Sequence, residues 1–171
     1  MSVILEFIKE RRSVRDFQNK PLSEKIINKL LTAAQNAPSA GNLQPWKFFV
    51  ITHPDLKKDL AQAAFQGFIN KAPLVIVVCA LPERSAAHYG ERGRNLYCLQ
   101  DTAAAVQNIL LTATSLGLGS CWVGAFSETE VSKILHLSAE IRPVALIPLG
   151  YPQTKPQPTK RIPLEKITQY F

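Results

Sequence analysis

The spacing of apolar residues along the chain predicts several helices separated by turn residues. Val3–Arg11 has apolar positions at helical spacing and predicts a short helix. A second amphipathic pattern follows Ser23, which can cap it. It should end before Pro38, because the residue ahead of a proline avoids the helical region. The longest helical pattern, Leu96–Leu116, stops at Gly117. We therefore expect helices near the start, before Pro38 and in the second half of the chain.

Strand patterns lie between these helices. Four runs rich in branched and aromatic residues predict strands at Trp46–Thr52, Leu74–Leu81, Leu118–Val123 and Val144–Leu149. The second of these runs is apolar on both faces, which is typical of a strand buried on both sides. Further helices are expected from Pro54 and after Ser127, which forms an S-x-x-E capping box with Glu130. Because strands and helices do not alternate regularly, we expect an α+β fold with a mixed central sheet flanked by helices.

The last twenty residues differ from the rest of the chain. Pro152, Pro156 and Pro158 predict an extended arm over residues 152–171. The end of this arm, IPLEKITQYF, is apolar but separated from the body of the domain. Docking on a partner subunit is the favoured interpretation, and docking on its own domain is the alternative, since a chain terminus is normally disordered unless it is tied down. At 171 residues, the whole of 1–171 fits one domain.

Composition and charge argue against several classes of protein. With 46% hydrophobic and 19% charged residues, the chain is globular in composition. The net charge is +7, but no run of five or six like charges exists, which fits an anionic small molecule better than a nucleic acid. The longest apolar run, Pro73–Pro82, is too short to span a bilayer, and the first residues do not resemble a signal peptide. Three cysteines without a C-x-x-C pair are typical of a reducing compartment, so we expect a cytoplasmic protein that binds neither nucleic acid nor membrane.

Two basic groups are candidate anion ligands. Arg11, Ser13 and Arg15 alternate, so an extended backbone would place all three on one side, where guanidinium and hydroxyl groups can bind a phosphate. The alternative is that these cations only favour the negative end of the preceding helix. A second group, Lys160 and Arg161, could join the first only if the arm folds back or crosses to a partner.

Two further segments indicate a ligand pocket. Residues 37–51, APSAGNLQPWKFFVI, place the amides of Asn42 and Gln44 against Trp46 and a predicted strand. Residues 117–126, GLGSCWVGAF, carry glycines that let the backbone approach a planar ligand, although the G-x-G-x-x-G spacing of a dinucleotide site fails at Trp122. The three histidines lack metal-ligand spacing, and Cys121 has no base beside it in the sequence. These features suit a bound cofactor that carries the chemistry itself.

Four motifs in this order, RRSVRDF, PSAGNLQPW, GLGSCWVGAF and KRIPLEKI, together resemble the nitroreductase family of flavin enzymes. The resemblance implies a nitroreductase-like α+β fold and a homodimer with FMN at the interface. The C-terminal arms would be exchanged, each adding a strand to the partner's sheet. NADH or NADPH would reduce the FMN, and an electron-poor small molecule, such as a nitroaromatic or a quinone, would then accept the hydride in the same place. No metal is expected.

The resemblance also assigns cofactor-binding residues. The phosphate and ribityl chain would be bound by Arg11, Arg12, Ser13, Arg15, Lys160 and Arg161. The loop that covers the flavin from the other subunit would contribute Pro38, Ser39, Ala40, Asn42 and Gln44. The ring would lie against Val123, Gly124 and Ala125, with Gln66 at its pyrimidine edge. No side chain is expected to be catalytic, and the Gly124 N–H would donate to the flavin nitrogen that accepts the hydride.

The reaction itself stays open at this point. Relatives of this fold also carry out dehalogenation and flavin fragmentation, and a low-turnover flavin-storage protein is a further alternative. Glu83–Tyr97 is the only segment with room for a lid over the pocket, so substrate identity does not follow from the resemblance.

Overall fold

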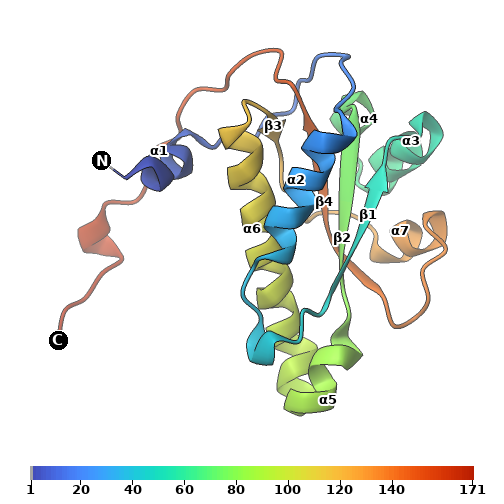
Figure 1. Ribbon diagram of the computed structural model, residues 1–171, viewed down its shortest axis with the longest axis vertical. Coiled ribbons are helices and arrows are strands. Elements are labelled where there is room, and N and C mark those ends of the chain that lie inside the picture. The colour runs from blue at the N-terminus through green and yellow to red at the C-terminus, as the bar shows by residue number, and fades with distance from the viewer. Residues whose placement is uncertain (1) are drawn as a thin grey trace.

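A four-stranded sheet forms the centre of the computed structural model, which describes residues 2–171 (Figure 1). Its strands are β1 (Trp46–Ile51), β2 (Leu74–Ala80), β3 (Gly119–Ser120) and β4 (Arg142–Gly150), in the order β1-β2-β4-β3. All neighbouring strands pair antiparallel. Within residues 2–171, parallel pairing is confined to an isolated bridge between Ser13 and Ser120. The sheet is therefore antiparallel in its ladders, rather than mixed as the sequence suggested.

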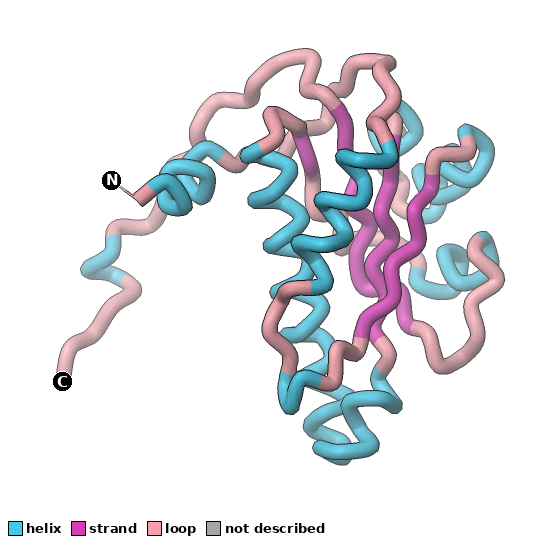
Figure 2. The backbone as a smooth tube through the Cα atoms, in the orientation of Figure 1, coloured by secondary structure: helices cyan, strands magenta, loops and turns pink. Residues whose placement is uncertain are grey.

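Helices cover both faces of the sheet and divide the core into two layers (Figure 2). One face carries α2 (Glu24–Gln35) and α6 (Cys98–Ser115), and the other carries α3 (Pro54–Ala63), α4 (Phe68–Lys71) and α7 (Glu128–Ile134). Side chains of β2 alternate between the layers, with Ile76 in the first core and Val77 in the second. Every residue of β2 is buried, which confirms the predicted strand buried on both faces and the α+β class.

The two predicted helix caps form, with one difference. The Ser23 hydroxyl accepts the N–H of Ile26 at 3.4 Å, and the Ser127 hydroxyl accepts the N–H of Glu130 at 3.3 Å. The Glu130 carboxylate does not return to Ser127 but accepts from Lys133 at 2.8 Å. The Ser127 N–H instead donates to the carbonyl of Ala63 at 2.9 Å, so the second half of the capping box is not needed.

The strand predicted over Leu118–Val123 is shorter than expected. Only Gly119–Ser120 forms a ladder with β4, and pairing resumes at an isolated bridge between Val123 and Leu146. Between these points Pro148 of β4 accepts from the Cys121 N–H at 3.2 Å but has no N–H to donate in return. The proline therefore interrupts the ladder and leaves the following residues irregular.

The segment Glu83–Tyr97 is mostly helical. It contains α5 (Pro82–Arg92) and a π-helical turn at Gly93–Tyr97 that leads into α6 (Figure 1). Arg94 donates to both carboxylate oxygens of Glu83, at 2.9 and 2.6 Å, and also pairs with Glu91. The role of a lid remains a prediction, but the segment that would perform it is ordered by its own ion pairs.

The two ends of the chain extend away from the sheet. The helix α1 (Val3–Glu10) buries none of its residues, and it lies beside the C-terminal arm, to the left of α6 in Figure 1. Large apolar side chains are exposed on both segments: Val3, Ile4, Leu5, Ile8, Ile162, Leu164, Ile167, Tyr170 and Phe171. The alternative in which the tail docks on its own domain is therefore not observed. Among residues 2–171, no helix is long and apolar enough to cross a membrane.

Candidate functional site

A cationic cavity of about 530 Å³ lies where the end of α1, the middle of α6 and the C-terminal arm meet. It is lined by Ile8, Lys9, Arg11, Arg12, Ser13, Gln107, Leu110, Trp122, Thr159 and Arg161. Basic residues from the two ends of the chain thus converge on one cavity, and their guanidinium groups are suitable ligands for a phosphate. The contribution of Gln107 from α6 was not anticipated from the sequence, because a glutamine on a long helix carries no local signal.

The arginine segment is held against the sheet in an extended conformation. The Val14 N–H donates to the Ser120 carbonyl at 2.9 Å, and Ser13 forms the parallel bridge with Ser120. Val14 is buried and packs closely on Gly119, where an added Cβ would lie 2.7 Å from the Val14 side chain. The absence of a side chain at Gly119 therefore permits the close approach that brings Arg11 and Ser13 to the cavity.

The arginines do not all serve the cavity. Arg12 lines it, but its guanidinium also donates to the carbonyls of Lys9 and Arg11, so the helix-end interpretation holds for this residue. Arg15 lies outside the cavity lining, and its guanidinium carbon is 5.8 Å from the centre of the Phe68 ring. Lys160 is also outside the lining, whereas its neighbour Arg161 is part of it and donates to the Thr159 hydroxyl at 3.2 Å.

None of the three buried cysteines is a candidate nucleophile. Burial raises the pKa of Cys121, although Arg15, the Ser13 hydroxyl and Arg11 oppose the shift. Burial also raises the pKa of Cys98, and it raises the pKa of Cys79 to about 12. All three thiols are free and stay protonated at neutral pH, whereas the thiolate is the reactive form.

The glycine-containing segment after Cys121 presents free backbone donors. Val123 uses both its N–H and its carbonyl in 3.0 Å bonds to Leu146, but the exposed Gly124 and Ala125 have N–H groups without a partner in residues 2–171. A Cβ added at Gly124 would meet nothing within 4 Å. The Gln66 amide donates to the Ala125 carbonyl at 3.5 Å. The structure thus brings Gln66, Gly124 and Ala125 together at the surface, next to the buried Val123.

The amides of the loop Pro38–Gln44 stabilise the loop itself. The Gln44 amide donates to the Asn42 carbonyl and side-chain oxygen at 3.2 and 3.3 Å, and the Ser39 hydroxyl accepts the Gln44 N–H at 3.0 Å. Asn42 and Gln44 have φ values of 55° and 50°, and Gly41 has 57°, so this short turn needs such support. Trp46, two residues after Gln44, is buried in the first core layer and anchors the end of the loop there.

The loop is attached to α6 and α5 by contacts that sequence reasoning missed. The Ala40 N–H donates to a carboxylate oxygen of Asp101 on α6 at 3.1 Å. Arg84 of α5 donates to the Gln44 carbonyl at 3.0 Å. The hydroxyl of Tyr89, also on α5, lies 2.8 Å from where a Cβ at Gly41 would be. Ala40 and Asp101 are 61 residues apart in sequence, so only the folded chain reveals the contact between them.

The loop is bound near the start of α6, whereas the cationic cavity lies against the middle of this helix. Ala40 is bound by Asp101 near the start of α6, whereas Leu110 of the cavity lies about two and a half turns farther along the helix. None of Pro38, Ser39, Ala40, Asn42 and Gln44 lines the cavity. Within residues 2–171, the loop and the cavity are therefore separate features of the chain.

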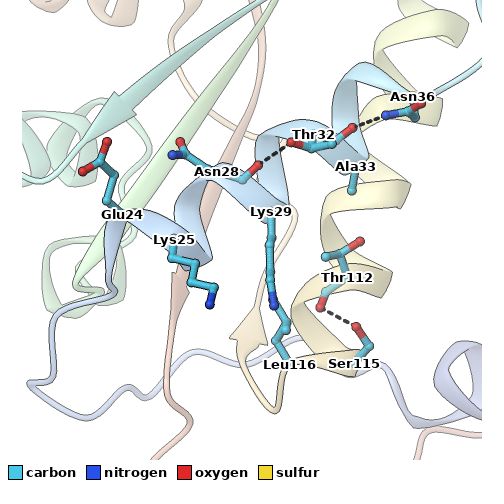
Figure 3. Close-up of a pocket in the computed structure, with 10 residues that line it drawn as sticks. All are labelled: Glu24, Lys25, Asn28, Lys29, Thr32, Ala33, Asn36, Thr112, Ser115 and Leu116. Carbon is cyan, nitrogen blue, oxygen red and sulfur yellow. Dashed lines mark hydrogen bonds between the residues drawn. The ribbon is translucent and has the colours of Figure 1, made fainter.

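Larger cavities elsewhere contain none of the predicted cofactor residues. A groove of about 810 Å³ runs between α2 and α6, with Lys25 and Lys29 on one side and Thr112 and Ser115 on the other (Figure 3). The Ser115 hydroxyl donates to the Thr112 carbonyl at 2.9 Å, so part of its polar lining is satisfied internally. Another cavity, of about 970 Å³, lies between α5 and α7. Size alone does not identify the candidate site.

The fold and the site define a small α+β protein with a cationic cavity, whose lining residue Trp122 lies two positions before Gly124, an exposed residue with a backbone N–H that has no partner within residues 2–171. Comparisons with known proteins agree with this description. The sequence model of the nitroreductase family matches residues 8–71 and 61–151. The chain therefore belongs to the nitroreductase family, a family of FMN-dependent NAD(P)H oxidoreductases.

Individual relatives cover most of the chain. An NADH dehydrogenase of Thermus thermophilus is 31% identical, over 92% of this chain and 91% of that protein. An FMN reductase (NADPH) of Bacillus subtilis is 26% identical, over 98% and 73%. An iodotyrosine deiodinase of Haliscomenobacter hydrossis is 27% identical, over 86% and 78%. The crystal structure of a nitroreductase family protein from Clostridium novyi superposes with a TM-score of 0.80 at 34% identity, covering 91% of this chain and 89% of that one.

Proposed function

We propose that the chain binds FMN between two subunits and uses NADH or NADPH to reduce an electron-poor small molecule, such as a nitroaromatic or a quinone. One observation carries this proposal. Arg11, Ser13 and Arg161 converge on a cavity whose lining residue Trp122 is followed two positions later by the free N–H of Gly124. A ligand with its phosphate at the cavity could therefore place a ring at the glycine-containing segment. FMN has this shape, because a ribityl chain joins its phosphate to its flavin ring.

The residues present fit this cofactor. Arg11, Ser13 and Arg161 supply cationic and hydroxyl donors for the phosphate. Arg15 is placed beside Phe68 and close enough to Cys121 to influence its pKa, so we assign it to the ring side of the site rather than to the phosphate. The Gln66 amide, which donates to the Ala125 carbonyl, would bind the pyrimidine edge of the flavin ring.

The second copy of the chain supplies what one chain lacks. No residue of the loop Pro38–Gln44 lines the cavity of its own chain, so we assign the loop to the cofactor of a partner subunit. The exposed apolar residues of α1 and of the arm 152–171 provide a surface for such a partner, since contiguous exposed apolar groups mark protein interfaces. We assign the apolar end of the arm, after Arg161, to the partner subunit, while Arg161 stays at the cavity of its own chain.

In this mechanism the flavin, when bound, supplies hydride transfer, and the chain supplies binding, orientation and electrostatics. The Gly124 N–H would donate to the flavin nitrogen that accepts the hydride, because it is exposed and has no other acceptor within residues 2–171. Arg15 would stabilise negative charge on the reduced ring. No acid–base pair is needed from the protein.

A second reaction class is favoured by one observation, the similarity to an iodotyrosine deiodinase over 86% of the chain. Reductive dehalogenation would use the same flavin site with a different acceptor.

We also place the enzyme in the cytoplasm, where three unpaired thiols are stable.

The test begins with the purified protein. Its absorbance should show bound flavin, the released cofactor should be FMN, and NADH or NADPH should bleach the spectrum without oxygen. A nitroaromatic or a quinone should then restore the colour faster than a halotyrosine does. A colourless protein that takes up no FMN would refute the proposal, and faster reoxidation by a halotyrosine would favour dehalogenation. A coloured protein that neither nicotinamide bleaches would indicate flavin storage.

A further inference from the structure

Asp101 is a buried carboxylate with a single hydrogen bond. The residue lies near the start of α6 and is 7% exposed. One carboxylate oxygen accepts the Ala40 N–H at 3.1 Å, and the other has no partner within residues 2–171. Leaving a buried carboxylate half satisfied is costly, so the contact it does make must matter to the fold or to the site.

The bond between Asp101 and Ala40 restrains a turn whose backbone conformation is unfavourable. Ala40 precedes Gly41, Asn42 and Gln44, which all adopt positive φ. Two non-glycine residues in this region make the turn unfavourable unless its surroundings fix it. Ser39 and Arg84 hold the Gln44 end, and Asp101 holds the Ala40 end. Asp101 therefore ties the loop to α6, the longest helix within residues 2–171.

We propose that Asp101 is a positioning residue that acts in trans: by holding Ala40, it fixes the loop Pro38–Gln44 over the FMN bound by the partner subunit. This inference rests on the proposed function, because it requires FMN at the cavity of the partner. Asp101 would thus contribute to the FMN site although it does not line the cationic cavity of its own chain and belongs to none of the sequence motifs.

Three single variants test the positioning role. Asp101→Ala should raise the dissociation constant of FMN about tenfold, because the loop is no longer fixed in advance and must be ordered when FMN binds. Asp101→Asn keeps an acceptor for the Ala40 N–H and should retain most of the affinity. Ala40→Pro removes the donor instead, at a first-turn position that proline tolerates, and should reproduce the loss even if Asp101→Ala folds poorly.

Thr102 offers the matched control. It neighbours Asp101 and is 1% exposed, but its hydroxyl bonds only within α6, to the carbonyls of Cys98 and Leu99 at 2.9 and 3.0 Å. Thr102→Val should leave FMN affinity unchanged. If Asp101→Ala and Ala40→Pro both fold and bind FMN as the wild type does, Asp101 is not a positioning residue. If the wild type itself binds no FMN, the proposed function fails instead.

A heterodimer then separates action in trans from action in cis. Two differently tagged chains are co-expressed, one with Arg11→Ala and the other with Asp101→Ala, and the mixed dimer is isolated through both tags. If Asp101 acts in trans, both defects fall on one site, and about one FMN per dimer stays tightly bound. If it acts in cis, each site carries one defect and neither retains FMN, which would overturn the proposal.

Discussion

The Val14 N–H donates to the Ser120 carbonyl at 2.9 Å, and this bond joins the arginine segment to the strand that leads to Gly124. The side chain of Val14 occupies the space where a Cβ at Gly119 would lie. The distance between the phosphate end and the ring end of the proposed site is therefore set by packing at one glycine. Such a close approach is a common reason for glycine at a given position.

A methyl group at Gly119 should disturb both the fold and the site. Gly119→Ala would place its Cβ 2.7 Å from Val14, so we expect a loss of about 1–3 kcal/mol in the free energy of unfolding. FMN affinity should fall as well, because the arginine segment must shift. Urea denaturation and flavin titration measure the two effects.

Gly124→Ala is the matched control for stability, since a Cβ there meets nothing within 4 Å. Its free energy of unfolding should stay within about 0.5 kcal/mol of the wild type. Equal stability of the Gly119 and Gly124 variants would contradict the packing argument.

Arg11 should contribute far more to FMN binding than an arbitrary cation on the arm. Arg11→Ala removes a donor that lines the cavity, so the dissociation constant should rise by about ten- to hundredfold, as for a bond worth about 1.5–3 kcal/mol. Lys160→Ala changes the net charge equally, but Lys160 lies outside the lining and should have a much smaller effect. Similar losses in both variants would show that only net charge matters.

Apolar patterning predicted the framework because burial is encoded locally. The uninterrupted apolar run and the length of Leu74–Leu81 were enough to place β2, and Ser23 was enough to start α2. The strand predicted at Leu118–Val123 forms only over Gly119–Ser120, because its ladder fails at Pro148, which lies on a different strand. The helix α5 was treated only as space for a lid, since its support comes from Arg94, outside the helix.

The candidate site was also predicted only where local residue types indicate it. Residue types in RRSVR and in the arm suggested an anion site, and folding does bring Arg11 and Arg161 to one cavity. The amides of Asn42 and Gln44 were interpreted as ligand contacts, but they bond to each other because the turn adopts positive φ. The Asp101–Ala40 contact depends on tertiary structure alone, and no local pattern encodes it.

Removing the arm should dissociate the proposed dimer. Deletion of Thr154–Phe171 takes away five exposed apolar side chains and Arg161 of the cavity. We expect a monomer that has lost FMN, because burial of apolar surface drives association and the phosphate loses a cation. Light scattering after gel filtration gives the mass, and absorbance gives the flavin content. A truncated protein that stays dimeric and yellow would show that the arm is not the interface.

Asp101 should also make stability depend on pH in a direction unusual for a carboxyl group. Burial raises the pKa of Asp101 above its ordinary value of 3.8, although the Ala40 N–H opposes the shift. A carboxyl group whose folded pKa exceeds its unfolded pKa stabilises the fold fully below the unfolded value, and this contribution is lost as pH rises through the folded value. The wild type should therefore lose stability relative to Asp101→Asn as pH rises from about 4 towards 7. Urea denaturation of both proteins across this range measures the difference, and Thr102→Val should run parallel to the wild type. A difference that stays constant with pH would mean that burial does not disfavour the Asp101 carboxylate.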